Sequence, residues 1–201
     1  MAADLVRQTA ENARARLILL HGWGADANDL MPLGIALAEE ITTPMEIIAL
    51  QAPQFQDQGT GRQWYGLFPA DWAAVPTAIA GLKQRINNLG SEEIPLEATV
   101  LLGFSQGGAM ALATGCDLPL AGLIACSAYA HPNWQAPIIR PPVLLLHGQQ
   151  DNVVPQTASM SLRNELADGN QSCDYCSFDG GHTIPAEAQD QMKKALKHWL
   201  N

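Results

Sequence analysis

Gly103-Phe104-Ser105-Gln106-Gly107 stands between an apolar stretch, Thr99-Val100-Leu101-Leu102, and a run of small residues that begins at Gly108. The apolar stretch predicts a buried strand, and the small residues predict a helix. The pentapeptide is then the tight turn of a nucleophile elbow, in which a strained backbone holds the serine hydroxyl clear of the sheet. Side chains at positions 103 and 107 would collide with such a turn, so glycine fits both places.

The pattern Gly-x-Ser-x-Gly is by itself a weak signal in a chain with 17 glycines. The plain alternative is a glycine-rich turn in which Ser105 is an ordinary helix-capping residue. Downstream residues favour the first interpretation, because a serine nucleophile on this kind of turn needs an acid and then a base in that chain order.

Candidates for the acid and the base both follow predicted strands. The run at residues 142–148 is typical of a buried parallel strand and leads to Asp151 on a loop. The strand-like run at residues 173–178 leads to a glycine-rich loop that carries His182. Open α/β sheets bind ligands at the carboxyl ends of their strands, so Ser105, Asp151 and His182 are expected to meet there.

Other aspartates are weaker candidates for the acid. Asp179 is the second choice, because it lies on the loop that carries His182. The remaining three are interpreted as a helix-end surface charge, a solvent-facing strand residue and a turn residue, namely Asp168, Asp174 and Asp117.

The other histidines are weaker candidates for the base. His131 lies in a proline-containing connection and His198 on a C-terminal helix, so both are interpreted as surface histidines. His21 and His147 end predicted strands, where a histidine is typical of loop-ordering hydrogen bonds, and both are near enough to line the site.

A second glycine-rich turn, His21-Gly22-Trp23-Gly24-Ala25-Asp26, follows the predicted strand at residues 16–20. An oxyanion hole needs two backbone N–H groups aimed at the alkoxide that develops in acyl transfer. We assign these N–H groups to Trp23 and to Gln106, the residue after the serine. The alternative is a plain turn before a helix that starts near Asn28.

Four segments together resemble the phospholipase/carboxylesterase family, a group of small serine esterases that includes acyl-protein thioesterases and lysophospholipases. They are His21-Gly22-Trp23-Gly24-Ala25-Asp26, Gly103-Phe104-Ser105-Gln106-Gly107-Gly108-Ala109-Met110-Ala111, His147-Gly148-Gln149-Gln150-Asp151-Asn152-Val153-Val154-Pro155 and Gly181-His182. The resemblance extends over nearly the whole chain. It implies Ser105 as nucleophile, Asp151 as acid and His182 as base. It also implies Trp23 and Gln106 as the oxyanion donors.

The resemblance implies a serine carboxylesterase that hydrolyses esters of small to medium acyl chain through an acyl-enzyme intermediate. It implies no metal and no organic cofactor. An acyl-protein thioesterase and a lysophospholipase remain alternatives, and so does a ligand-binding receptor on a hydrolase fold, because fold does not determine function. The chain departs from the family pattern at Trp23, where Leu is more common, and at Gln63-Trp64-Tyr65-Gly66, where Arg/Ser-Trp-Phe-Asp is common. Both departures fall near the expected substrate groove, so they bear on which substrate is bound and not on the chemistry.

The least regular segment is residues 51–72, which is rich in glutamine, glycine and aromatic residues. Long loops in compact domains are often functional. Trp64, Tyr65, Leu67 and Phe68 are therefore expected to wall a groove for the acyl chain. The alternative is a satellite hydrophobic cluster that packs this loop against the rest of the protein.

The remaining chain alternates predicted strands and helices. Helices are expected at residues 30–39, from Val75 to a stop at Gly90, at 156–166, and at the C-terminus, and further strands are expected at 45–50 and 121–126. This order predicts an α/β-hydrolase fold with a mostly parallel, doubly wound sheet of about six or seven strands. The connection at residues 127–142 is short and rich in proline, so no lid domain is expected.

Composition predicts one domain over residues 1–201 and limits the partners. The net charge of -9 argues against nucleic acid and against stable association with anionic membranes, which leaves a small-molecule ester or acyl-thioester. A homodimer is left open. The first seven residues lack a signal peptide pattern. Four cysteines in a chain of this length predict no disulfide framework. Cys173 and Cys176 would face opposite sides of a strand, which suits neither a redox pair nor metal ligation. A reduced, cytoplasmic location is therefore expected.

Overall fold

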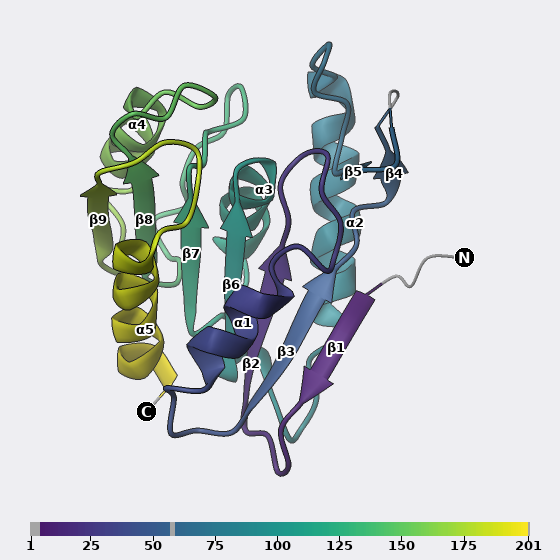
Figure 1. Ribbon diagram of the computed structural model, residues 1–201, viewed down its shortest axis with the longest axis vertical. Coiled ribbons are helices and arrows are strands. Elements are labelled where there is room, and N and C mark those ends of the chain that lie inside the picture. Colours follow the sequence, from purple (N-terminus) through teal and green to yellow (C-terminus); the bar gives the residue numbers. More distant parts are fainter. Residues whose placement is uncertain (1–4, 57–58, 201) are drawn as a thin grey trace.

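The computed structural model describes residues 5–56 and 59–200. Its main sheet has seven strands in the order β1-β3-β2-β6-β7-β8-β9 (Figure 1). The strands are β1 (Leu5–Thr9), β2 (Ala15–Leu20), β3 (Met45–Leu50), β6 (Thr99–Phe104), β7 (Gly122–Cys126), β8 (Val143–Gly148) and β9 (Cys173–Phe178). All neighbours pair in parallel except β1, which is antiparallel to β3. The expected open α/β sheet is therefore confirmed.

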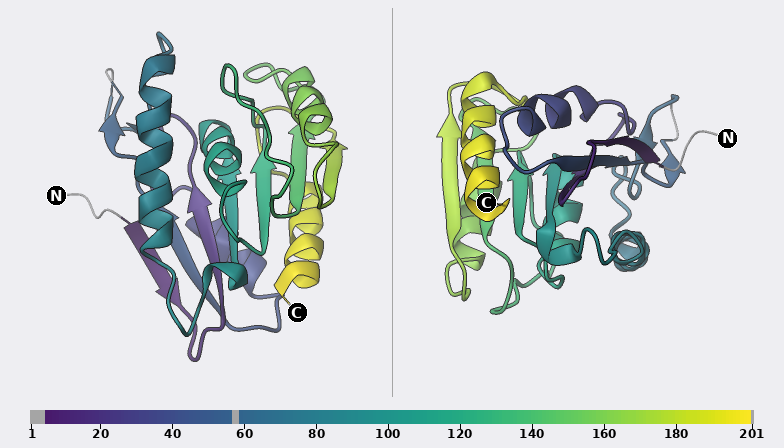
Figure 2. Two further views of the ribbon diagram at one scale, coloured as in Figure 1. Left: turned by 180° about the vertical axis from the view of Figure 1, so that it is seen from behind. Right: turned by 90° about the horizontal axis from the view of Figure 1, so that it is seen from below.

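Helices cover both faces of this sheet (Figure 2). They are α1 (Met31–Ala38), α2 (Val75–Asn87), α3 (Gln106–Gly115), α4 (Thr157–Glu165) and α5 (Ala186–Leu200). Short 3-10 turns precede α2 and β6, at Trp72–Ala74 and Leu96–Ala98. Helices α1 and α5 lie on one face, and α2, α3 and α4 lie on the other.

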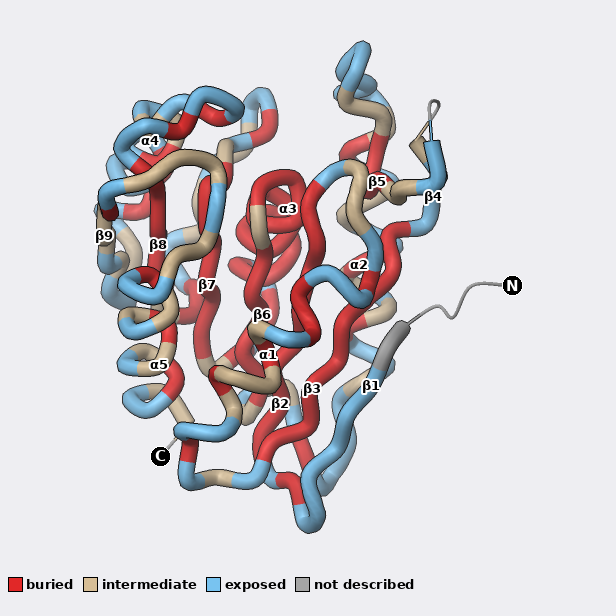
Figure 3. Tube along the Cα trace, viewed as in Figure 1, coloured by how far each residue is buried: buried red, intermediate tan, exposed pale blue. Residues whose placement is uncertain are grey.

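Two hydrophobic cores lie between the sheet and these helix layers. In β2, Ile18 and Leu20 join the core under α2 and α3, whereas Leu17 and Leu19 join the core under α1 and α5. Successive strand residues point to opposite faces, so a strand buried on both sides needs a continuous apolar run. Figure 3 shows the central strands buried along their length and β1 exposed at the edge.

An edge strand, β1, and a hairpin of two short strands were not expected from the sequence. Strand β1 pairs with β3 at the sheet edge. Its residues Arg7, Gln8 and Thr9 are polar and exposed, so its sequence has no continuous apolar run. Within the irregular segment 51–72, β4 (Gln54–Phe55) and β5 (Arg62–Gln63) form a two-stranded hairpin. Residues 57–58 of that segment lie outside the described residues, and so do residues 1–4, which enter the signal-peptide expectation.

The predicted helices form close to their expected limits. In α5, Met192 and Leu196 are buried and Trp199 is half-buried. The Trp199 ring lies so close to Gly122 that a Cβ there would meet it at 2.1 Å. Cys173 packs against one core and Cys176 against the other, which confirms that they face opposite sides of β9. Residues 127–142 contain no helix, as expected for a fold without a lid.

The order of the strands indicates a candidate ligand site at the carboxyl ends of the central strands. From β2 the chain moves to β3 on one side, whereas from β6 it moves to β7 on the other. Loops that leave the carboxyl ends of β2 and β6 therefore turn apart and leave a crevice, where open α/β sheets bind ligands. In the part of the chain that the structure describes, no helix is both long and apolar enough to span a membrane.

Candidate active site

Ser105 occupies a strained turn between β6 and α3. Its backbone has φ 55° and ψ -119°, a region that residues with a Cβ rarely adopt. The turn is closed by two glycines, because a Cβ on Gly103 would lie 2.1 Å from the Gly107 oxygen, and a Cβ on Gly107 would lie 2.1 Å from the Leu20 oxygen. The predicted elbow therefore forms, with its serine at the carboxyl end of β6.

Asp151 and His182 form a hydrogen-bonded pair. His182 Nδ1 donates to Asp151 Oδ2 at 2.7 Å, and the other carboxylate oxygen accepts from the N–H groups of Val153 at 2.9 Å and Val154 at 2.8 Å. Burial by itself raises the pKa of Asp151, but these hydrogen bonds outweigh it, so the pKa lies below its ordinary value. Asp151 is therefore an anion that holds the imidazole with Nδ1 protonated and Nε2 turned away.

His147 lies beneath this pair and is fully buried. Its Nε2 is 2.8 Å from the Val154 carbonyl oxygen, which can only accept, so this nitrogen carries a proton. The same Nε2 is 3.4 Å from Asp151 Oδ2, and Nδ1 is 2.5 Å from Ser159 Oγ. His147 thus orders the loop that carries Asp151, in keeping with its interpretation as a loop-ordering histidine.

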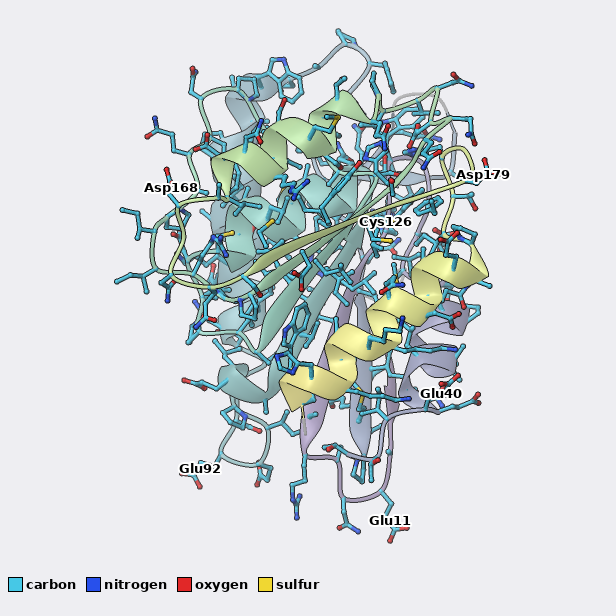
Figure 4. The ribbon with its side chains drawn as sticks, turned by 90° about the vertical axis from the view of Figure 1, so that its left-hand side faces the viewer. Glu11, Glu40, Glu92, Cys126, Asp168 and Asp179 are labelled. Atoms are coloured by element: carbon cyan, nitrogen blue, oxygen red, sulfur yellow. The ribbon has the colours of Figure 1, made fainter. Side chains whose placement is uncertain are left out.

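The second-choice carboxylate lies elsewhere. Asp179 is exposed, and no hydrogen bond or ion pair joins it to His182 among the described residues. Figure 4 shows Asp179 and Asp168 at the periphery, near opposite ends of β9. Asp117, Asp168 and Asp174 are exposed, as expected of surface residues, and His198 is exposed as well.

Ser105 and His182 line one groove with a volume of about 410 Å³. Its walls are otherwise mostly apolar and consist of Trp23, Leu67, Phe68, Tyr129, Val153, Val154, Pro155 and Ala158. Among the described residues no hydrogen bond joins Ser105 Oγ to His182; such a contact is often long in an unliganded site and shortens when substrate binds. The Phe104 ring packs 4.7 Å from the His182 ring, centre to centre, and restricts its orientation.

The groove corrects one expectation about the wall. Leu67 lines it, but Trp64 and Tyr65 are only 1% and 0% exposed and belong to the core between the sheet and α2. Their backbones are held there by the Gln106 side chain, which accepts from Trp64 N at 3.1 Å and donates to Tyr65 O at 2.8 Å. The satellite-cluster alternative therefore describes these two aromatic residues better.

Sequence reasoning missed most of the groove wall. Val153, Val154, Pro155 and Ala158 come from the loop after β8 and the start of α4, and Tyr129 follows β7. Only the Val-Val-Pro after Asp151 was a signal, because three apolar residues directly after a polar loop residue need a surface to pack on.

The backbone N–H groups of Trp23 and Gln106, the expected oxyanion donors, have no hydrogen-bond partner among the described residues. Gln106 begins α3, so its N–H has no partner within the helix, and Trp23 N donates to no other described residue. His21 determines the orientation of the Trp23 N–H group. Its Nδ1 donates to the Gly22 oxygen at 2.7 Å, and in a trans peptide this turns the N–H of Trp23 the opposite way.

Both ring nitrogens of His21 are used in this turn. The Ala52 N–H donates to its Nε2 at 3.2 Å, so Nε2 is unprotonated. Burial lowers the pKa of His21, which agrees with a neutral ring held in one tautomer. The Trp64 indole donates to the His21 carbonyl at 3.0 Å and braces the same turn from below.

His131 is not a surface histidine, contrary to the sequence interpretation. It is 5% exposed, and its Nε2 lies 2.9 Å from Tyr65 Oη. The phenol hydroxyl of Tyr65, which is far from His131 in the sequence, provides its polar partner inside the protein.

A larger hollow of about 720 Å³ lies at the opposite ends of the strands, near the start of β7 and β8. It contains no serine and no histidine. Burial raises the pKa of its one thiol, Cys116, to about 12, so this thiol stays protonated. Among the described residues no group of three or more His, Cys, Asp or Glu side chains is arranged to hold a metal ion.

Comparisons with known sequences point to one protein family. A family model described as Phospholipase/Carboxylesterase matches residues 1–200. Acyl-protein thioesterase 1 of Neurospora crassa is 28% identical over 159 residues, which are 68% of this chain and 65% of that protein. A probable carboxylesterase of Oryza sativa subsp. japonica is 27% identical over 141 residues, which are 66% of this chain and 53% of that protein. The matches thus span from 53% to 65% of these relatives' lengths.

Solved structures agree with this result. Esterase PE8 superposes with a TM-score of 0.86 at 29% identity, over 98% of this chain and 97% of that chain. SOBER1 of Arabidopsis thaliana superposes with a TM-score of 0.77 at 21% identity, over 94% of this chain and 100% of that chain, and shows the likeness of fold.

Proposed function

The chain belongs to the phospholipase/carboxylesterase family, and we propose that it is a serine carboxylesterase that hydrolyses esters of small to medium acyl chain. Esterase and thioesterase relatives support a hydrolase of the esterase type. The observation that carries the proposal is the 2.7 Å bond between Asp151 and His182 on the groove that also contains Ser105.

In the proposed mechanism, Ser105 Oγ attacks the ester carbonyl carbon while His182 Nε2 takes its proton. Asp151 keeps the imidazole in the required tautomer and stabilises the imidazolium that forms. The N–H groups of Trp23 and Gln106 hold the oxyanion of the tetrahedral intermediate. His182 then protonates the leaving alcohol, and a water molecule hydrolyses the acyl-enzyme by the same route.

The groove supports the proposed substrate size. A volume of about 410 Å³ lies at the lower end of the range for small-molecule sites, and its apolar wall suits a hydrocarbon chain. Residues 127–142 contain no helix that could act as a lid, and Tyr129 of this segment lines the groove. Soluble monomeric esters are therefore expected to react without a jump in rate at their micellar limit.

A fluorophosphonate probe tests the nucleophile. Ser105→Ala should lose labelling and nearly all ester hydrolysis, whereas the exposed helix variant Ser161→Ala should keep both. Full labelling of Ser105→Ala would show that another residue is the nucleophile. Wild-type protein that binds esters but neither reacts with the probe nor turns them over would favour the ligand-binding alternative.

The relatives that are named acyl-protein thioesterases make a thioesterase the second candidate. A series of p-nitrophenyl esters of increasing acyl length, measured beside the matched thioesters and a lysophospholipid, separates the candidates. We expect the highest kcat/KM on an ester of small to medium chain. A clear preference for long-chain thioesters would reassign the protein as a thioesterase.

A further inference from the structure

Three polar rings form a chain from the interior to the groove. His131 Nε2 lies 2.9 Å from Tyr65 Oη, and Tyr65 Oη lies 2.7 Å from Tyr129 Oη. Tyr65 and His131 are buried, whereas Tyr129 is half-buried and lines the groove beside Ser105. The chain therefore connects a buried imidazole to the wall of the proposed substrate site.

The number of protons in this chain is determined by burial. Burial raises the pKa of both Tyr65 and Tyr129, so each remains a neutral phenol with one O–H. Burial also lowers the pKa of His131 to about 4, so its ring is neutral and has one N–H at ordinary pH. The three rings together carry three such protons, and the two hydrogen bonds between them use two. One proton therefore has no acceptor within this group of three side chains.

The direction of the hydrogen bonds follows from His131 Nδ1. This nitrogen is buried and has no hydrogen-bond partner among the described residues. A buried N–H without an acceptor is rarer in proteins than a buried acceptor without a donor. The proton of His131 is therefore on Nε2, where it is donated to Tyr65 Oη.

Tyr65 then donates its own proton to Tyr129 Oη, because the reverse direction would leave the O–H of the fully buried Tyr65 without an acceptor among the described residues. Tyr65 is the one partner of Tyr129 Oη among the described residues, so no protein acceptor remains for the Tyr129 proton. Tyr129 lines a groove whose other walls are largely apolar, so an acceptor for this proton can come from a ligand in the groove. A polar group in such a wall is costly when it is left without a partner and favourable when a ligand pairs with it.

From this geometry we propose that Tyr129 is a specificity residue which donates a hydrogen bond to an oxygen acceptor in the substrate. The proposal rests on the esterase function and names a substrate class within it, namely esters that carry a ketone or ether oxygen in the acyl chain. His131 and Tyr65 act as positioning residues, because they orient the Tyr129 hydroxyl. A site built around a hydrogen bond discriminates against the analogue that cannot form it.

The test uses p-nitrophenyl esters in matched pairs. Each pair has one acyl chain of a given length and the same chain with a ketone or ether oxygen, and the oxygen is moved along the chain from pair to pair. For each pair the preference is the ratio of kcat/KM for the oxygenated ester to that for the alkyl ester. Tyr129→Phe removes only the hydroxyl. Dividing the wild-type preference by the Tyr129→Phe preference for the same pair cancels the difference in intrinsic reactivity between the two esters.

We expect at least one oxygen position at which Tyr129→Phe lowers the preference by roughly five- to tenfold, the size of one neutral hydrogen bond. Tyr175→Phe is the matched control, because its hydroxyl accepts from Gln156 Nε2 at 2.9 Å and does not line the groove. It should keep the wild-type preference. If no position in the series shows a preference that depends on Tyr129, the proposal is wrong.

Tyr65→Phe tests the positioning role. Without the hydroxyl of Tyr65, Tyr129 keeps its proton but loses its orientation, so the preference should fall between those of the wild type and Tyr129→Phe. An unchanged preference would overturn the relay. Hydrolysis of the alkyl esters by the wild type reports the proposed function separately, so failure of that function and failure of this inference give different results.

Discussion

Replacing Ser105 with glycine is expected to make the protein more stable while it destroys the proposed activity. The serine backbone has φ 55° and ψ -119°, where the Cβ is strained and glycine is not. The side chain contributes little in exchange, because Ser105 Oγ has no hydrogen-bond partner among the described residues. Ser105→Ala is the matched control, since it removes the same hydroxyl and keeps the Cβ.

The size of the effect follows from two opposing contributions. Relief of the strained conformation stabilises the native state by about 1–3 kcal/mol. Glycine also gains freedom in the unfolded chain, which destabilises the native state by about 0.5–1 kcal/mol. The net gain of Ser105→Gly over Ser105→Ala is then between about 0 and 2.5 kcal/mol, with a centre of about 1 kcal/mol, which raises Tm by about 2–4 °C in a chain of this size.

Urea unfolding and thermal scans of the wild type and both variants measure this difference. Fluorophosphonate labelling of the same samples checks that both variants have lost the nucleophile. The reasoning about strain would be refuted if Ser105→Gly were no more stable than Ser105→Ala. Equal stability would mean that the turn holds no strain that glycine can relieve.

Three further perturbations test the proposed acid, the buried His131 and the turn that carries Trp23. Asp151→Asn should lower kcat by roughly 10³- to 10⁴-fold, because the amide oxygen stays on the N–H groups of Val153 and Val154 and the NH2 group then faces His182 Nδ1, which imposes the wrong tautomer. Asp179→Asn should cause no such loss, and a larger loss in that variant would identify Asp179 as the acid. The lowered pKa of His131 means that the unfolded chain binds more protons below pH 6.5, so the free energy of unfolding falls as pH decreases toward about 4. Between pH 7.5 and pH 4.5 the wild type should lose about 2.5 kcal/mol relative to His131→Gln in urea titrations, and a constant difference would contradict a buried neutral ring. His21→Leu should lower kcat by about tenfold or more with little change in KM, and His21→Asn, which keeps a donor near the Gly22 oxygen, should recover much of the loss; equal losses in both variants would show that the bond to Gly22 does not orient the oxyanion donor.

Local sequence patterns were sufficient for the fold and for the order of the candidate site residues. The continuous apolar runs of β2, β6 and β8 exclude an exposed strand, because both of their faces must be buried. Parallel strands present their carboxyl ends at one edge, so loops after β6, β8 and β9 bring Ser105, Asp151 and His182 together from sequence order alone. Strand β1 escaped prediction because an exposed edge strand needs no such run.

The walls of the groove could not be predicted in the same way. Trp64 and Tyr65 have the composition of a substrate wall, but the Gln106 side chain and the core under α2 hold them inside the protein. Apolar composition alone does not say whether an aromatic residue faces a ligand or a core. That choice depends on which segments pack against it.

The sequence by itself determined the sheet, the elbow and the positions of the acid and base candidates, because each depends on residues near one another in the chain and on the common direction of parallel strands. Only the tertiary structure decided what surrounds them. His131 reads as a surface residue until Tyr65, far away in the sequence, is placed 2.9 Å from its ring. Burial, tautomer and the free proton of Tyr129 all follow from contacts between distant segments, and such contacts have no periodic signature in the sequence.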